Sequence, residues 1–257
     1  MKTCRLWLVK EEIEEERLPL ATVIIIDVML ATTTLVDLME RGAKKIHPVS
    51  SIEEALEKKK NARRKCDYRR RTWRNIIAEF DYGHLPEHYS GDLLKEAELV
   101  FLSTNGTKAI QGTKRAKRRV LANLRNVHYV SSWLKTQEIE DLIIVCSGAG
   151  GHMAMEDYLC AALLIGELDT KQTKLDDAAL FAFTQKLNEK RVKELVKLGR
   201  VGRYMKRHGM NELLQFTSDI GASKSIVEAI NPGVLAFIEG GKAGGRNDFG
   251  KARGRIG

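Results

Sequence analysis

Three times in this 257-residue chain an apolar, strand-like run leads into a loop of small polar residues and then into a helix-like segment. The three segments are residues 21–39, 97–110 and 142–165. In a parallel α/β sheet such loops gather at the carboxyl ends of the strands, where ligands usually bind. Their Thr, Ser, Asn and Gly residues, with a few carboxylates, suit a phosphorylated ligand and a hard cation. The repetition predicts an α/β fold with a largely parallel or mixed sheet and an anion site at its edge.

The charge balance also indicates anionic partners. The formal net charge is +9, and basic residues concentrate in 58–74, 113–119 and 240–257. Phosphorylated metabolites and nucleic acid both fit such clusters, and so does a merely solvated helix face. Nucleic-acid binding is disfavoured because only Tyr68 and Trp73 in the first cluster offer aromatic rings on which bases stack.

Location and redox state follow from what the sequence lacks. The amino terminus has no apolar core long enough for a signal peptide, and no stretch approaches the roughly 20 apolar residues of a membrane helix. A cytoplasmic protein without membrane association is expected. Cys4, Cys66, Cys146 and Cys160 show no CxxC pairing, which predicts free thiols rather than a zinc site.

Apolar periodicity places the elements around the three loops. The expected strands are 5–9, 21–27, 44–49, 99–102, 127–130 and 142–146. The expected helices are 33–41, 108–114, 132–138 and 155–168, with further helical spacing over 175–187 and 192–199. Ser51 and Glu54 form a capping-box pattern. Residues 1–239 are predicted to form one domain, followed by a Gly-rich, disordered tail at 240–257.

Asp27 ends the apolar run of the first loop, and a carboxylate there is costly to bury unless it is paired or binds a cation. Thr32, Thr33 and Thr34 follow and offer hydroxyl groups to an anion. The alternative is structural: Thr33 or Thr34 caps the helix, and backbone amides satisfy Asp27.

The second loop runs from Ser103 to Thr107 and leads into a helix with Lys108 in its first turn. Successive backbone N–H groups in such a turn form an anion-binding concavity. A plain Asn-Gly turn capped by Thr107 explains the same residues.

The third loop, residues 147–152, is neither a Walker loop nor a dinucleotide fingerprint, but its glycines allow close approach of a ligand. Glu156 and Asp157 follow in the first helical turn, where acids complement the helix dipole or ligate Mg²⁺. His152 is a candidate general acid or an exposed loop residue.

At these residues the chain resembles the 2-phosphosulfolactate phosphatase family, Mg²⁺-dependent enzymes of coenzyme M biosynthesis. The matching motifs are IIDVMLATTT (25–34), GAKKIHPVSSIEEAL (42–56), FDYGHLP (80–86), STNGTKAI (103–110), VCSGAGGHMAMEDYLCAALL (145–164) and LDDAAL (175–180). The resemblance implies a three-layer α/β/α fold and hydrolysis of (2R)-2-phospho-3-sulfolactate to 3-sulfolactate and phosphate. With the apolar helices, it also favours a homodimer.

The resemblance assigns roles residue by residue. The implied catalytic residues are Asp27, Asp81 and Asp157, and the implied Mg²⁺ ligands are Asp27, Glu156 and Asp157. The implied substrate-binding residues are Thr32, Thr33, Thr104, Asn105, Gly106, Thr107, Gly148 and Gly151. Direct attack by water and a phospho-aspartyl intermediate both stay open.

One departure from the family pattern supports a different hypothesis. Leu30 stands where the family usually has an Arg, and leucine offers no donor to phosphate or sulfonate. The alternative is a catalytically impaired relative that only binds anions. Arg69, Arg70 and Arg71 are candidates to supply the missing charge.

Overall fold

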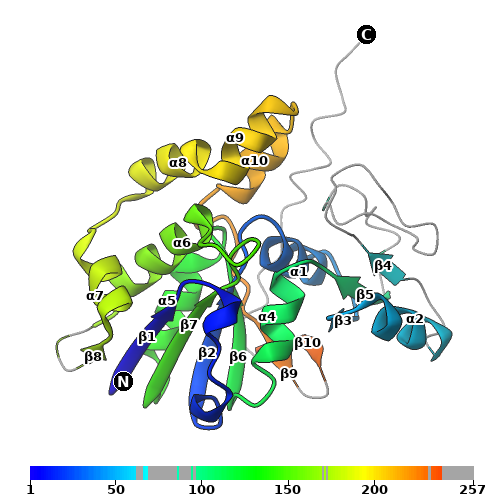
Figure 1. Ribbon diagram of the computed structural model, residues 1–257, viewed down its shortest axis with the longest axis horizontal. Helices are drawn as coiled ribbons and strands as arrows, with labels where there is room; N and C mark the ends of the chain where they lie inside the picture. Colours follow the sequence, from blue (N-terminus) through cyan, green and yellow to red (C-terminus); the bar gives the residue numbers. More distant parts are fainter. Residues whose placement is uncertain are drawn as a thin grey trace.

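The computed structural model describes residues 1–61, 66–68, 86, 94, 97–169, 171, 173–230 and 233–238, which form an α/β architecture (Figure 1). The strands are β1 (Thr3–Trp7), β2 (Ala21–Ile26), β3 (Lys45–Val49), β4 (Cys66–Tyr68), β5 (Glu98–Leu102), β6 (Arg118–Ala122), β7 (Asp141–Cys146), β8 (Lys174–Leu175), β9 (Val227–Ile230) and β10 (Val234–Phe237). They form one mixed sheet in the order β4-β5-β3-β10-β9-β6-β2-β7-β1-β8. The predicted fold class is confirmed.

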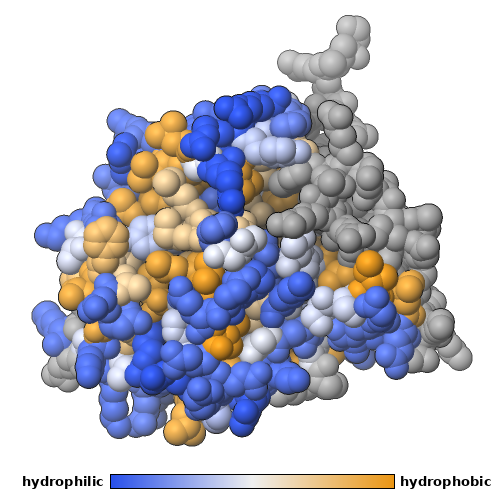
Figure 2. Space-filling model, viewed as in Figure 1, coloured by the Kyte–Doolittle hydropathy of each residue, from blue (hydrophilic) through white to orange (hydrophobic). Residues whose placement is uncertain are grey.

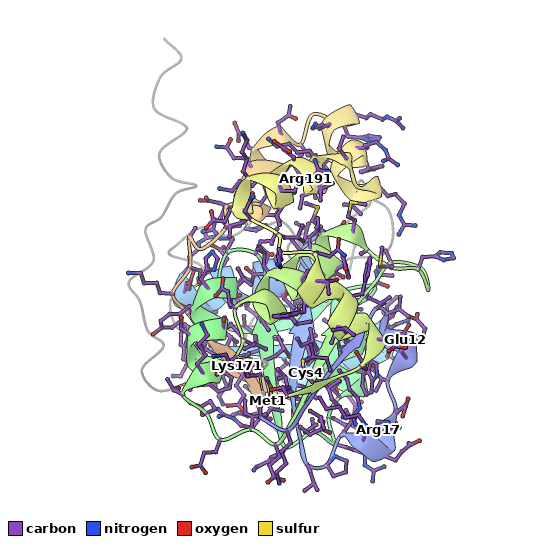
Figure 3. All side chains as sticks on the ribbon, turned by 90° about the vertical axis from the view of Figure 1, so that its left-hand side faces the viewer. Met1, Cys4, Glu12, Arg17, Lys171 and Arg191 are labelled. Carbon is purple, nitrogen blue, oxygen red and sulfur yellow. The ribbon has the colours of Figure 1, made fainter. Side chains whose placement is uncertain are left out.

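Helices cover both faces of this sheet. They are α1 (Ala31–Glu40), α2 (Ile52–Asn61), α4 (Gly106–Gly112), α5 (Val127–Lys135), α6 (Met155–Gly166), α7 (Asp177–Thr184), α8 (Glu189–Leu198), α9 (Arg200–Arg207) and α10 (Asn211–Thr217), with short 3₁₀ turns η1 (Lys10–Glu12) and η2 (Glu15–Arg17). Buried side chains of α5 to α10 share one core cluster, whereas those of α1 and α4 share another. Figures 1 and 3 show α8, α9 and α10 as a further layer beyond α6.

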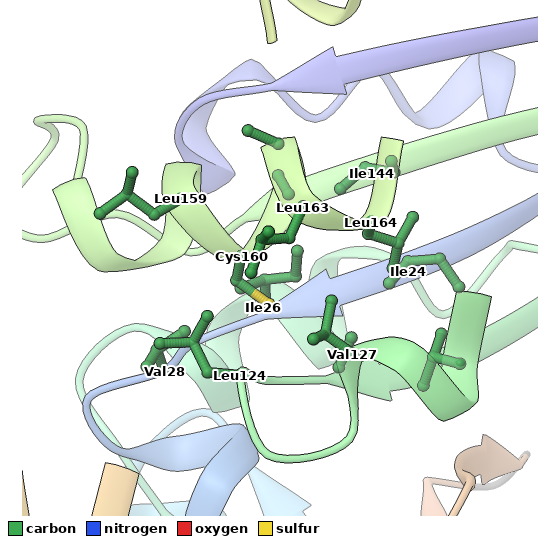
Figure 4. Packing of buried hydrophobic residues seen from close by; sticks show 14 of the residues in the cluster. Ile24, Ile26, Val28, Leu124, Val127, Ile144, Leu159, Cys160, Leu163 and Leu164 are labelled. Carbon is green, nitrogen blue, oxygen red and sulfur yellow. The ribbon is translucent and has the colours of Figure 1, made fainter. Parts of the chain in front are cut away.

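Strand β2 is buried on both faces of the sheet, and this burial explains why all its residues except Thr22 are apolar. Ile24 and Ile26 face the cluster with α5 and α6, where Cys160 and Leu164 of α6 pack over them (Figure 4). Val23 and Ile25 face the opposite cluster. A strand buried on both faces needs apolar residues at every position rather than at alternate ones.

Strand direction reverses along the sheet. Strands β6, β2, β7, β1 and β8 are parallel to one another, and so are β3, β4 and β5. Three antiparallel pairings, β6 with β9, β9 with β10 and β10 with β3, separate the two blocks. The block containing β5 therefore runs opposite to the block containing β2 and β7, so the three loops do not share one simple parallel edge.

One prediction of local structure was wrong, and a neighbouring strand was not predicted at all. Residues 127–130 begin helix α5 rather than forming a strand, and the strand of this region is β6, which was not predicted. Val127, Val130 and Leu134 are buried at helical spacing, and the side chain of Asn123 accepts hydrogen bonds from the backbone just before the helix. An apolar run as short as this one is compatible with either helical or strand periodicity, and the hydrogen bonds to Asn123 favour the helix.

Several other expectations can be placed. Cys4, Cys146 and Cys160 are buried free thiols. None of the helices in the described ranges is long and apolar enough to cross a membrane. The Gly-rich tail, and with it the predicted domain boundary at 239, lies outside the described residues. Figure 2 shows apolar side chains gathered over α7 and α8, and Leu180 and Phe181 of α7 are exposed there. The expected homodimer stays a prediction.

Candidate active site

Asp27 lies directly after β2, and its carboxylate is buried against the first turns of two helices. Oδ1 accepts the N–H of Ala31 at 3.3 Å, and the N–H of Gly106 in α4 also stabilises the charged form. Burial outweighs these contacts and the charge of Lys10, so the pKa of Asp27 is raised from 3.8 to about 6. Asp27 is therefore a strand-end acid that titrates about two pH units above an ordinary aspartate.

Asp157 connects the first loop to the third. Its Oδ1 accepts the N–H of Val28 at 2.8 Å, and its Oδ2 accepts the N–H of Gly148 at 3.1 Å. Burial raises the pKa of Asp157 well above its usual range, and the charges of Asp27 and Glu156 raise it further. Asp157 thus positions both loops while sitting in the electric field of two other carboxylates.

Glu156 is the third carboxylate of the group and is 3% exposed. Burial raises its pKa, a hydrogen bond from its own backbone N–H opposes the rise, Asp27 adds to it and Arg200 lowers it. Glu156 also lines a pocket of about 330 Å³ between the start of α6 and the start of α9. The charge of Asp27 therefore acts on both Glu156 and Asp157, and Glu156 also faces a pocket, while the roles of the three residues as Mg²⁺ ligands stay a prediction.

The donor chemistry of these three residues fits a hard cation, since carboxylate oxygens are the ligands that Mg²⁺ takes. Burial without matching positive charge is the arrangement that a cation relieves. Within the described ranges, no three His, Cys, Asp or Glu side chains converge as a ready ligand set. Asp157 already spends both oxygens on backbone N–H groups. Asp27 likewise accepts two backbone N–H groups, from Ala31 and Gly106, whereas Glu156 accepts only its own N–H among the described residues and is the freest donor of the three. Asp81, the other predicted catalytic acid, lies outside the described residues.

The second loop reaches Asp27 through Gly106. A Cβ on Gly106 would stand 2.6 Å from Oδ2 of Asp27 and 2.4 Å from Cβ of Ala31, so only glycine allows this approach. Thr107 is fully buried, and it exchanges hydrogen bonds with Ser103, whose Oγ accepts the Thr107 N–H at 3.0 Å. Thr104 is exposed and Asn105 half-buried, and neither side chain bonds another described residue. In this loop, therefore, Ser103, Gly106 and Thr107 hold the backbone in place, whereas the side chains of Thr104 and Asn105 bond no other described residue.

The threonines of the first loop turn inward. The hydroxyl oxygen of Thr32 lies 2.8 Å from the carbonyl oxygens of Asp27 and of Ala122, either of which can accept its one hydrogen, and the hydroxyl of Thr33 donates to the carbonyl of Val28 at 2.8 Å. The residue before α1 is Leu30, and no side chain caps this helix. The structure places Thr32 and Thr33 as supports of the Asp27 loop, in place of the predicted threonine cap.

The third loop forms a tight turn from Ala149 to His152. Ala149 N–H donates to the His152 carbonyl at 2.8 Å, with Gly150 and Gly151 at φ +65° and +76° between them. Gly148, at φ +64°, has no room for a Cβ, which would stand 2.8 Å from the His152 carbonyl oxygen and from Cγ1 of Val9. The turn leaves His152 exposed at the rim of the pocket.

Three residues near the carboxylates were not predicted from the sequence. Lys10, whose side chain is 11% exposed, pairs with Glu11 at 2.7 Å and lowers the pKa of Asp27. Ser147 is fully buried, donates its N–H to the Ile26 carbonyl at 2.8 Å, and has a hydroxyl without a partner among the described residues. Arg200 lines the pocket. Nothing local in the sequence marks Lys10 or Arg200, but the position of Ser147 directly after β7 was a usable signal.

Comparison with known proteins agrees with this geometry. The family model for 2-phosphosulpholactate phosphatase matches residues 7–232. A probable 2-phosphosulfolactate phosphatase of Clostridium novyi is 33% identical over 175 residues, covering 66% of this chain and 73% of that protein. One of Clostridium perfringens (strain SM101) is 27% identical over 235 residues, covering 89% and 94%. One of Thermotoga maritima is 34% identical over 158 residues, covering 62% and 66%.

The family match spans both the carboxylate group and the α8–α10 layer beyond it. The chain belongs to the 2-phosphosulpholactate phosphatase family of phosphoric monoester hydrolases.

Proposed function

We propose that this protein is a Mg²⁺-dependent phosphatase that hydrolyses (2R)-2-phospho-3-sulfolactate to 3-sulfolactate and phosphate, as in coenzyme M biosynthesis. The observation that carries the proposal is the group formed by Asp27, Glu156 and Asp157: the charge of Asp27, just after β2, raises the pKa of both Glu156 and Asp157 in the first turn of α6. A group of acids next to the backbone N–H groups of loops can bind both a cation and a phosphate ester.

The assignment of roles follows the family resemblance and the hydrogen bonds that the three carboxylates already make. Asp27 and Glu156 would hold Mg²⁺, with Asp157 contributing from its place between the two loops. A bound Mg²⁺ supplies charge stabilisation for the phosphoryl oxygens. Thr104 and Asn105, together with the turn containing Gly148 and Gly151, would orient the phosphate.

Two chemical routes fit the position of Asp27. In one, a carboxylate oxygen of Asp27 attacks phosphorus, the ester P–O bond breaks, and water then releases phosphate from the aspartyl phosphate. In the other, water attacks phosphorus directly and a carboxylate takes its proton. Acid quenching during turnover of radiolabelled substrate separates them, because only the first route leaves label on the protein.

The test of the proposed function is phosphate release from phosphosulfolactate and a panel of small phosphate esters, with Mg²⁺ or with EDTA. Mg²⁺-dependent release that prefers the sulfonated ester is expected. Asp27→Asn should abolish it without loss of the fold, whereas Asp177→Asn, in the first turn of α7, should leave it intact. A folded wild-type protein that cleaves no ester would instead favour the impaired, anion-binding relative.

A further inference from the structure

The pocket beside Glu156 carries more positive charge than hydrolysis of a simple phosphate ester needs. Besides Glu156 it is lined by His152, Leu198, Gly199, Arg200 and Arg203, among others. Two of these residues are arginines on consecutive turns of α9, three positions apart, so their side chains share one face of the helix. The pocket is therefore a cationic cavity with a single buried acid at its inner side.

Arg200 is held in the direction of the active-site loops. Its Nη2 donates to the carbonyl of Ala149 at 3.1 Å, which ties α9 to the turn of the third loop. Its charge also lowers the pKa of Glu156. A guanidinium group has five N–H donors in a planar fork, so this anchored side chain keeps donors for a second, anionic partner. Arg203 is tied differently, through a bond from its Nη1 to the carbonyl of Leu198.

The pocket adjoins the carboxylate group at Glu156. Glu156 lines the pocket, and its Oε2 would stand 3.6 Å from a Cβ on Gly199, which directly precedes α9. Its neighbour Asp157 accepts the N–H of Val28, the residue after Asp27. A substrate whose phosphate lies at Asp27 can thus extend a second group past Glu156 towards α9. A neutral or cationic group would gain nothing from two arginines there, whereas a sulfonate or carboxylate would accept their N–H donors.

The packing of α9 fixes the backbone from which the two exposed arginine side chains extend. A Cβ on Gly202 would stand 2.0 Å from the carbonyl oxygen of Val196, so α9 lies directly against the end of α8. Val196 and Met205 are fully buried and anchor the two helices in the core. The arginines are consequently presented by a rigid support, which is what selective recognition of a small anion requires.

We propose that Arg200, assisted by Arg203, binds the sulfonate of phosphosulfolactate, an acidic group that this ester carries besides its phosphate and its carboxylate, and so sets the substrate class of this enzyme. This inference rests on the proposed function, and it adds the residues that distinguish the sulfonated ester from other phosphate esters. Asp27, Glu156 and Asp157 act on the phosphoryl group, whereas α9 selects what is attached to it.

The test compares two esters in four proteins. The esters are phosphosulfolactate and 2-phospholactate, which lacks the sulfonate. The proteins are the wild type, Arg200→Gln, Arg203→Gln and Arg191→Gln, the last being an exposed arginine on α8 away from the pocket (Figure 3). Arg200→Gln should raise KM for the sulfonated ester at least 10-fold and change kcat/KM for 2-phospholactate less than 3-fold. Arg203→Gln should act in the same direction more weakly, and Arg191→Gln should change neither ester.

Equal losses for both esters in Arg200→Gln, or no loss for either, would overturn the inference. Calorimetric titration of 3-sulfolactate separates this outcome from failure of the proposed function. If the wild type cleaves neither ester but binds 3-sulfolactate, and Arg200→Gln weakens that binding at least 10-fold, the anion site stands without the phosphatase. If the wild type does not bind 3-sulfolactate, or Arg200→Gln binds it equally well, the anion site is refuted. Gly202→Ala, which displaces α9, should weaken binding while both arginines are retained.

Discussion

Gly106 contacts Asp27 so closely that a single methyl group would not fit between them. The two residues lie 79 positions apart in the chain and follow strands that run in opposite directions, yet a Cβ on Gly106 would stand 2.6 Å from the Asp27 carboxylate. This contact brings an α4 backbone N–H to the acid and joins the two parallel blocks at the site. The position of Asp27 is thus fixed in part by a helix that follows the other block of strands.

Gly106→Ala tests this contact. The new methyl group meets Asp27 and Cβ of Ala31, neither of which can move away cheaply, so a loss of about 1–3 kcal/mol in the free energy of unfolding is expected. Phosphatase activity should fall at least 100-fold, since the acid is displaced. The matched control is Gly112→Ala in the same helix, whose Cβ would meet only the tip of Ile13 at 3.1 Å. Equal behaviour of the two variants in urea unfolding and in turnover would contradict the interpretation.

Asp27→Asn is predicted to stabilise the metal-free protein at alkaline pH. The folded-state pKa of Asp27 is raised from 3.8 to about 6, so the wild type gains stability as pH falls through 6 and loses it as pH rises. At about 1.4 kcal/mol per pKa unit, the charged form costs up to about 3 kcal/mol.

Urea unfolding in EDTA at pH 8 and pH 4 checks the prediction for Asp27. The variant should be more stable than the wild type by about 1–3 kcal/mol at pH 8, and most of this difference should disappear at pH 4, where Asp27 is protonated in the folded protein and about half protonated in the unfolded chain. A difference that is the same at both pH values would show that the charge of Asp27 is not its cause.

Asp157→Ala should be more damaging to the fold than Asp157→Asn. Alanine leaves the N–H groups of Val28 and Gly148 without their acceptor, at about 1–3 kcal/mol for each buried group. Asparagine keeps one acceptor oxygen and removes the buried charge. We expect Asp157→Ala to unfold about 2–4 kcal/mol more easily than the wild type, with the asparagine variant at least about 1 kcal/mol more stable than the alanine variant. Both should be inactive, and equal stability of the two would mean that the hydrogen bonds contribute little.

Leu30→Arg is predicted to destabilise the protein without improving turnover. Leu30 is 5% exposed and belongs to the core cluster shared with α6. An unpaired guanidinium group there should cost about 3 kcal/mol or more, whereas Leu30→Met should cost less than about 1.5 kcal/mol. Thermal unfolding and phosphate release on the three proteins provide the measurement. Higher turnover in Leu30→Arg would instead support the hypothesis of a catalytically impaired relative.

Much of the site was predictable because its residues lie close to strand ends. Asp27, Glu156 and Asp157 each stand at the start of a loop or helix next to an apolar run, and the structure brings them together. The capping pattern at Ser51 also holds in part: its Oγ accepts the Glu54 N–H at 3.2 Å, but the Glu54 carboxylate accepts the N–H of Ser50 instead.

What the sequence could not provide are relationships between distant segments. Arg200 lies 51 positions from the Ala149 carbonyl that holds it, and its surroundings in the chain are an ordinary amphipathic helix. The hydroxyls of Thr32 and Thr33 look available in the sequence, yet they are spent on backbone carbonyls that only the folded loop presents. Local chemistry identifies acids at strand ends, whereas the direction of a hydroxyl or a guanidinium group depends on tertiary packing.

The position of β9 and β10 in the sheet has a consequence for how this chain folds during its synthesis. These strands come late in the sequence, yet they sit between β6 and β3 near the middle of the sheet. Until residues 227–237 emerge, β6 and β3 each present an open edge to other nascent polypeptides. Synthesis interrupted before that point would release two half-sheets with unpaired hydrogen-bonding groups, a species prone to aggregate. Because synthesis proceeds from the amino terminus, the two halves of the sheet can be joined only near its end.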